Sequence, residues 1–186
     1  EHFRLLGRNA LELGVLAFGS RERLERLTRL EDFHHLSAHF GKPIVLFAPH
    51  FIGLNMGGTR TAGATPASAS IYSRQKNPVL DWLFLRARLR FGEPKLVSRQ
   101  DGLRAVVKVL KAGHCLYFLP DMDFGPRDAI FTPFFGVPAA TITALPRLAR
   151  LGGAVVVPVV TRIEGDGYVA RFYPAWEDYP TGDVEA

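Results

Sequence analysis

The sequence predicts a single α/β domain over residues 1–186, with a mostly parallel central sheet flanked by helices. Short apolar runs bounded by Gly and Pro alternate with segments of helical period, which is the pattern of successive β-α-β units. The length of 186 residues suffices for one core, and no repeat, low-complexity tract or linker divides it. We therefore expect one domain, with a helical N-terminal portion at residues 1–40 and an α/β core at residues 41–186.

The N-terminal portion is predicted to contain two helices. Apolar side chains recur with helical period over residues 3–18. Ser20 is suited to cap a second helix at residues 21–30, in which glutamates offset arginines. Residues 31–40 are expected to continue as helix or turn until Pro43.

The core is predicted to alternate between strands and helices. Asn77 and Pro78 are typical of a helix start, while Asp101 and Gly113 are suited to open and close another helix. Pro158 predicts an edge position or an irregularity for its strand, because proline has no N–H for the ladder. The expected strands are 44–48, 67–72, 95–97, 114–119, 154–160 and 168–173, with an extended segment at 130–134, and the expected helices are 54–62, 77–91, 101–111 and 139–151.

The cysteine content and the apolar runs exclude two classes of protein. Cys115 is the one cysteine, so an internal disulfide framework is excluded, and its apolar neighbours predict a buried strand position. No apolar run approaches the roughly 20 residues that a membrane-spanning helix needs, and no signal peptide is visible.

The net charge of +5 is concentrated in the middle of the chain. Residues 72–111 hold ten basic side chains against three acidic ones. Such a block indicates an anionic partner, which includes a phosphorylated substrate, an acidic carrier protein, an anionic lipid or a nucleic acid. The alternative is a solvated helix face. Nucleic acid is disfavoured, because the block lacks the interleaved aromatic side chains of a base-stacking surface.

His50 is the first candidate for a catalytic residue. It follows the apolar run at residues 44–48 and precedes a turn that contains Gly53, so we expect it at the carboxyl end of a buried strand. Ligands of open α/β sheets bind at that edge. A histidine there can act as general base on a hydroxyl if a polar neighbour fixes its tautomer, and Asn55 is the local candidate for that neighbour.

The loop after the predicted strand at residues 114–119 is the second chemical segment. Asp121 and Asp123 can share a divalent metal, as in the Asp-x-Asp loops of many glycosyltransferases, or form ion pairs with basic residues, or serve only as loop and capping residues. Arg127 can pair with a phosphate or with a neighbouring aspartate. The apolar segment at residues 131–138 is expected to be core or to line a channel for an acyl chain.

Four blocks of residues follow one another along the chain. They are His50-Phe51-Ile52-Gly53-Leu54-Asn55, then Tyr72 with Asn77-Pro78-Val79-Leu80-Asp81-Trp82-Leu83 and Arg88, then Leu119-Pro120-Asp121-Met122-Asp123-Phe124-Gly125-Pro126-Arg127, then Phe131 with Pro133-Phe134-Phe135-Gly136-Val137 and Ala140-Thr141. In this order the blocks resemble the lipid A biosynthesis acyltransferases, the lauroyl and myristoyl transferases of Gram-negative bacteria. The resemblance extends over nearly the whole chain.

The resemblance implies an acyltransferase-like fold and an activity. It implies transfer of a fatty acyl group from an acyl carrier protein thioester to a hydroxyl of an anionic, phosphorylated glucosamine lipid, with no cofactor and no metal. It also implies a place on the cytoplasmic face of the bacterial inner membrane, peripheral or anchored by a segment outside these 186 residues. Another glycolipid or amino-lipid acceptor, or a non-catalytic lipid- or carrier-binding relative, is the alternative.

The resemblance also implies roles for individual residues. His50 would be the general base. Arg88, Asp121, Asp123 and Arg127 match residues of the family's site and are expected to bind substrate.

Two further basic residues are expected to contribute without a motif match. Arg74 and Lys76 lie in the basic block between the second and third motifs, and we expect them to face phosphates or the carrier.

Asn55 departs from the family pattern, which has Asp or Glu at this position of the His-x4-acid motif. An amide can still accept a hydrogen bond from the imidazole, but it supplies no negative charge. The corresponding Asp→Asn change in a serine protease triad costs about 10⁴ in turnover. The sequence therefore predicts an impaired acyltransferase, unless another carboxylate such as Asp121 or Asp123 compensates.

Overall fold

The computed structural model describes residues 1–122, 125 and 129–181, and it contains a seven-stranded sheet. In spatial order the strands are β1 (Thr28–Glu31), β9 (Gly167–Phe172), β8 (Val155–Glu164), β2 (Ile44–Phe47), β5 (Cys115–Phe118), β3 (Ser68–Tyr72) and β4 (Lys95–Ser98). Five neighbouring strand pairs run parallel, and β8 with β9 is the antiparallel pair. The predicted α/β fold with a mostly parallel sheet is confirmed.

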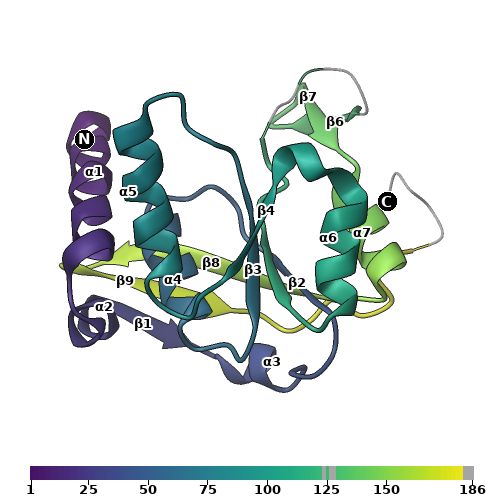
Figure 1. The fold of residues 1–186 in the computed structure, drawn as a ribbon. Coiled ribbons are helices and arrows are strands. Elements are labelled where there is room, and N and C mark those ends of the chain that lie inside the picture. The colour runs from purple at the N-terminus through teal and green to yellow at the C-terminus, as the bar shows by residue number, and fades with distance from the viewer. Residues whose placement is uncertain (123–124, 126–128, 182–186) are drawn as a thin grey trace.

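Helices cover both faces of this sheet (Figure 1). On one face, α6 (Gly102–Lys111) packs beside α7 (Ala144–Gly152). On the other, α4 (Leu54–Ala62) lies against the strands and also contacts α1 (His2–Phe18) and α5 (Pro78–Leu89), which pack against each other. The remaining helices are α2 (Arg21–Leu27), α3 (His34–Ser37) and the 3₁₀ helix η1 (Arg99–Asp101).

Strands β2 and β5, in the middle of the sheet, carry apolar side chains at every position, as expected of strands with both faces covered. In β2, Ile44 and Leu46 pack into the core on the side of α3 and α4. Val45, between them, points the other way and joins the core beneath α6 and α7. The two-residue period of a strand therefore divides one apolar run between two cores.

The two-stranded hairpin stands apart from the main sheet. It consists of β6 (Ala129–Phe134) and β7 (Val137–Ile142), which pair only with each other. Phe135 and Gly136 form its turn with φ angles of 49° and 79°. Figure 1 shows it at the top of the molecule, above α6.

Two of the predicted helices are wrong in part. The helix expected over residues 139–151 begins only at Ala144, because the hairpin turn commits Val137–Ile142 to the ladder with β6. The helix expected over residues 21–30 ends at Leu27, and Thr28–Glu31 form β1. Charges that suggested helical pairs instead join different strands of the sheet, since Arg29 of β1 pairs with Glu164 of β8 across the strand between them.

The predicted edge position of Pro158 is also wrong. Its strand, β8, lies between β2 and β9 inside the sheet. Pro158 stands opposite Phe47, the last residue of β2, and directly before Val159, the first residue that pairs with β9. The missing N–H therefore falls where both ladders end, so the sheet tolerates it.

Candidate active site

His50 and Asp121 meet at the carboxyl edge of the sheet. Strands β2 and β5 are parallel neighbours, and Phe47 is in register with Phe118. His50 lies three residues beyond Phe47, and Asp121 lies three residues beyond Phe118. The strand register therefore places the two side chains opposite each other.

The Asp121 carboxylate holds His50 at two points. Its Oδ1 lies 2.6 Å from the imidazole Nδ1, and its Oδ2 accepts a hydrogen bond of 2.7 Å from the His50 backbone N–H. Partial burial raises the pKa of Asp121, but the two hydrogen bonds and the charge of His50 outweigh it and lower the pKa. An ionised carboxylate only accepts, so Nδ1 carries the proton and Nε2 is the basic nitrogen.

The turn after His50 needs glycine at position 53. Gly53 has a φ of 90° and lies at the N-cap of α4. A Cβ built there would lie 2.5 Å from the ring of Tyr168. Both the backbone conformation and the close approach of Tyr168 fix the course of the chain from His50 into the helix.

Replacing Gly53 by alanine is expected to destabilise the fold by about 2 kcal/mol or more and to reduce activity, because strain and a clash fall next to His50. Gly41→Ala is the matched control, since Gly41 has a similar φ of 87° but open space around its Cβ position. Urea unfolding of both variants separates the clash from the strain. Equal stability of the two variants, with full activity, would contradict this role of Gly53.

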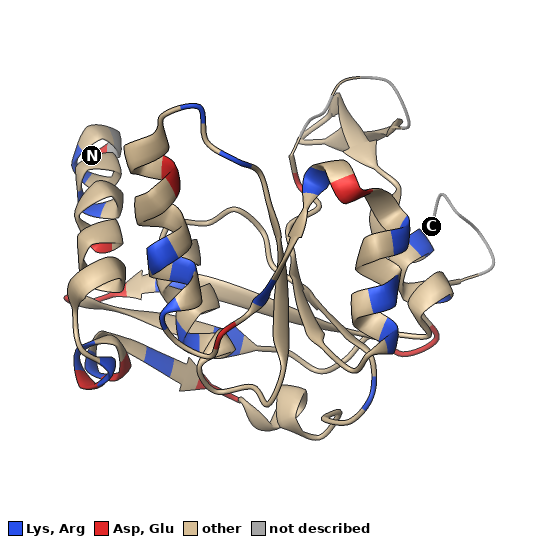
Figure 2. Ribbon diagram, in the orientation of Figure 1, with Lys and Arg blue, Asp and Glu red and all other residues tan. Residues whose placement is uncertain are grey.

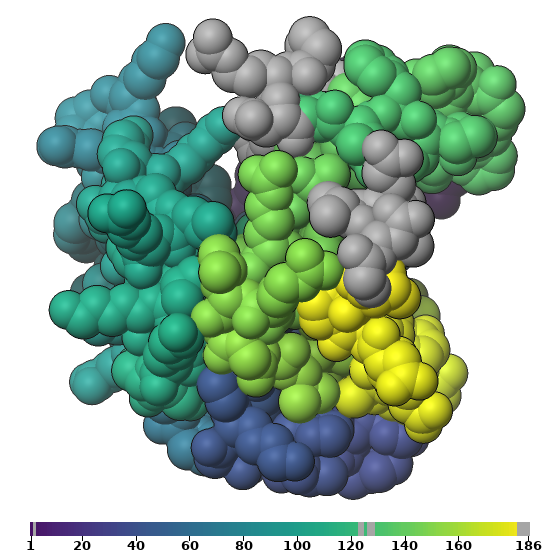
Figure 3. Space-filling view, turned by 90° about the vertical axis from the view of Figure 1, so that its right-hand side faces the viewer, coloured from purple at the N-terminus to yellow at the C-terminus, as the bar shows by residue number. Residues whose placement is uncertain are grey.

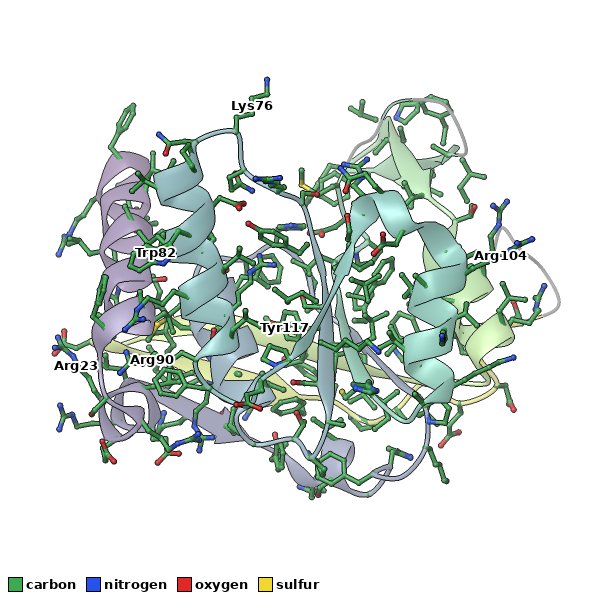
Figure 4. All side chains as sticks on the ribbon, in the orientation of Figure 1. Arg23, Lys76, Trp82, Arg90, Arg104 and Tyr117 are labelled. Atoms are coloured by element: carbon green, nitrogen blue, oxygen red, sulfur yellow. The ribbon has the colours of Figure 1, made fainter. Side chains whose placement is uncertain are left out.

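Within the part of the chain that the structure describes, Asn55 and His50 form no hydrogen bond with each other. It lies in the first turn of α4 and lines a narrow cavity of about 70 Å³ between that helix, α5 and the sheet. Leu46, Gly58 and Tyr117 line the same cavity. Figure 4 shows Tyr117 in the middle of the view, between α5 and α6. Asn55 therefore lies in the cavity wall, and the residue that hydrogen-bonds to the His50 imidazole is Asp121.

A second cavity of about 490 Å³ lies on the opposite face of the sheet, since Leu46 of β2 lines the first cavity and Phe47 lines the second. Asp121 lines it together with Phe47, Ile130, Trp176 and Tyr179. The Trp176 ring packs on Phe47, with centroids 5.2 Å apart, and on Tyr179 at 4.9 Å. The volume is that of an ordinary ligand site, for which about 300–1,000 Å³ is typical. Nothing in the sequence indicated that Trp176 and Tyr179 line a cavity, because both lie after the last strand and belong to no motif.

The predicted basic site residues lie at different places. Arg74 and Lys76 are exposed in the loop after β3, and Arg74 forms an ion pair of 3.9 Å with Asp81. Arg88 lines the narrow cavity, donates to the Ile71 carbonyl at 3.4 Å and lies over the Tyr72 ring. Burial lowers the pKa of its guanidinium.

Other members of the basic block face elsewhere. Arg86 donates to the Ala17 carbonyl of α1, and Arg104, Lys108 and Lys111 form an exposed stripe on α6 (Figure 2). The exposed basic residues of α6 agree with the alternative interpretation of the basic block, which is a solvated helix face.

Asp123 and Arg127 lie outside the described residues. Their predicted roles stay predictions.

Comparison with known proteins gives one family. The model of the bacterial lipid A biosynthesis acyltransferases matches residues 1–186. The lipid A biosynthesis lauroyltransferase of Escherichia coli (strain K12) is 33% identical over 190 residues, which cover 100% of this chain and 61% of the relative. The palmitoleoyltransferase of the same strain is 30% identical over 191 residues, with 100% and 61% coverage. The chain thus spans 61% of the length of these curated relatives.

A solved structure also aligns with this chain. It is the 1-acyl-sn-glycerophosphate acyltransferase of Thermotoga maritima, with a TM-score of 0.49 and 14% identity over 99% of this chain and 81% of the other.

Proposed function

The chain belongs to the bacterial lipid A biosynthesis acyltransferase family, and we propose that it transfers a fatty acyl group from an acyl carrier protein thioester to a hydroxyl of a phosphorylated glucosamine lipid. The observation that supports this most directly is the ionised Asp121 carboxylate on Nδ1 of His50, because it leaves Nε2 as a base at the carboxyl edge of the sheet.

His50 acts as general base in this mechanism. Its Nε2 takes the proton of the acceptor hydroxyl while the hydroxyl oxygen attacks the thioester carbonyl carbon. The C–S bond then breaks, the acyl group stays on the acceptor oxygen as an ester, and the imidazolium returns its proton to the leaving thiolate. Protons and electrons balance without a cofactor.

Asp121 acts as the positioning residue. Its hydrogen bond selects the tautomer of His50, and its charge stabilises the imidazolium that forms during transfer. This is the role that the His-x4-acid motif assigns to an acid at position 55. Asp121 therefore supplies what Asn55 lacks, and we propose that this chain is active as it stands.

The larger cavity beside Asp121 suits the apolar part of a lipid substrate, because its volume lies in the range of ordinary ligand sites. The narrow cavity that Asn55 lines is too small, at about 70 Å³, for a whole acyl chain. Arg74 and Lys76, exposed at the same edge of the sheet, suit the acceptor phosphate or an acidic carrier. The proposed location is the cytoplasmic face of the inner membrane.

The test is transfer of radiolabelled acyl groups from acyl carrier protein to a tetra-acylated lipid A precursor, with the chain as given and with Asn55→Asp. We expect turnover by both forms within about tenfold of each other, because Asn55 forms no hydrogen bond with the His50 imidazole in the described structure. Asp121→Ala is the control expected to be inactive. Turnover by Asn55→Asp alone would show that position 55 is the essential acid.

A chain that binds the precursor without turning it over, in every form, would instead be a non-catalytic relative. Equilibrium binding of the labelled precursor distinguishes this result from an inactive or unfolded preparation.

A further inference from the structure

The hairpin of β6 and β7 presents apolar side chains to solvent at the site edge. Phe131, Phe134, Phe135 and Val137 are 61%, 64%, 93% and 65% exposed. The sequence carries no Lys, Arg, Asp or Glu anywhere in residues 129–146. The expectation that this segment is core is therefore wrong for its tip, and Figure 3 shows the green hairpin standing out at the upper edge of the molecule.

Such a tip is poorly suited to water. A lone two-stranded hairpin is marginally stable in water, and contiguous exposed apolar surface marks an interaction site. Pro133 and Pro138 stand opposite each other in the ladder and have no N–H, so two backbone donors are absent near the tip. Fewer unpaired donors lower the cost of moving the tip into an apolar phase.

More apolar side chains surround the catalytic pair. Phe51 and Ile52 follow His50 directly, Met122 follows Asp121, and these three are 53%, 39% and 45% exposed. The base of the hairpin lines the larger cavity through Ile130. The exposed apolar tip, the cavity and the catalytic pair thus share one side of the molecule.

Cationic side chains accompany this apolar surface. Arg74 and Lys76 lie in the loop that follows β3, which ends at the same carboxyl edge as β2 and β5. Figure 4 shows Lys76 at the top of the view, pointing away from the body, and Figure 1 places the hairpin at the top as well. Apolar and basic side chains at one edge of a protein are complementary to an interface with anionic headgroups above hydrocarbon.

We propose that the tip of the β6–β7 hairpin, residues 133–138, inserts into the surface of an anionic lipid bilayer and seats the carboxyl edge of the sheet against it. Within the described residues, no helix is both long and apolar enough to span a membrane. The hairpin offers a shallow contact that needs no such span. This inference does not rest on the proposed reaction, because binding to lipid needs neither donor nor turnover.

A fluorophore at the tip tests the insertion. Cys115 is buried in β5, and burial raises the pKa of its thiol, so it is expected not to react in the folded chain. Phe135→Cys therefore accepts a single environment-sensitive label, and Leu151→Cys is the matched control. Leu151 is 50% exposed near the end of α7, which leads to the amino end of β8 at the opposite edge of the sheet.

On addition of phosphatidylethanolamine–phosphatidylglycerol vesicles, the label at position 135 is expected to brighten several-fold and shift to the blue, while that at position 151 stays as in buffer. Equal responses at both positions, or none at position 135, would overturn the proposal. A response at position 135 that depends on protein concentration without vesicles would show that a second copy, rather than lipid, covers the tip.

Partitioning of unlabelled variants gives an independent measure. Phe134→Asp and Phe135→Asp are each expected to reduce the vesicle partition coefficient by about tenfold or more, while Leu151→Asp leaves it unchanged. Lys76→Gln should weaken binding to anionic vesicles but not to phosphatidylcholine vesicles. Thermal unfolding checks that each variant is folded, and unchanged partitioning of the two folded Phe variants would contradict insertion of the hairpin.

Discussion

Asp121→Asn is expected to lower kcat by about 10³–10⁴, although the variant should fold normally. The carboxylate contacts both the backbone N–H and the Nδ1 of His50, and asparagine keeps the shape but loses the charge. An amide can also present its NH₂ group to Nδ1, which would move the imidazole proton to Nε2 and remove the base. The analogous change in a serine protease triad costs about 10⁴.

The measurement is steady-state transfer of labelled acyl groups to the lipid precursor, with KM determined separately from kcat. A positioning role predicts a fall in kcat with little change in KM, whereas a role in holding the acceptor predicts a rise in KM. Asp121→Glu is the conservative variant and should recover part of the rate. A kcat within tenfold of the unmodified chain would refute the pairing.

His50→Ala is expected to have an effect at least as large, with kcat reduced by about 10⁴ or more, because it removes the base itself. The His50 side chain is 39% exposed at the strand end, so the loss of the imidazole should not unfold the chain. Circular dichroism and thermal unfolding provide the control for folding. Substantial turnover by the variant would exclude His50 as the base.

The double variant His50→Ala/Asp121→Asn should be no slower than His50→Ala alone. Groups that act as one unit are strongly non-additive, because Asp121 acts through the imidazole that the first substitution removes. If the two substitutions instead reduced kcat by independent factors that multiply in the double variant, Asp121 would act by binding the substrate. This outcome separates the positioning role from the substrate-binding role predicted from the sequence.

The sequence predicted most of the core because its patterns are local. The apolar run of β2 and the turn at Gly53 are readable from consecutive residues, and so is the Asn77–Pro78 start of α5. The failures came where distant pairing outweighed local preference. Thr28–Glu31 look helical by charge spacing, yet they pair with β9, which lies more than 130 residues further along the chain.

The site was predicted only in part for the same reason. His50 could be recognised from its own neighbourhood, a histidine after a buried strand. The search for its partner stayed local and arrived at Asn55, which the structure places in the wall of the narrow cavity. Asp121 is 71 residues away in sequence and comes opposite His50 only because β5 is the neighbour of β2.

The sequence by itself therefore determined the α/β class, the family and the catalytic histidine candidate, since each depends on residue types and spacings within short segments. Tertiary structure alone decided the order of the strands, the partner of His50, the cavities on the two faces of the sheet and the exposure of the β6–β7 tip. The physical reason is that strand order and register are set by packing and hydrogen bonding between segments far apart in the chain. Residues brought together in this way leave no local pattern from which their contact can be predicted.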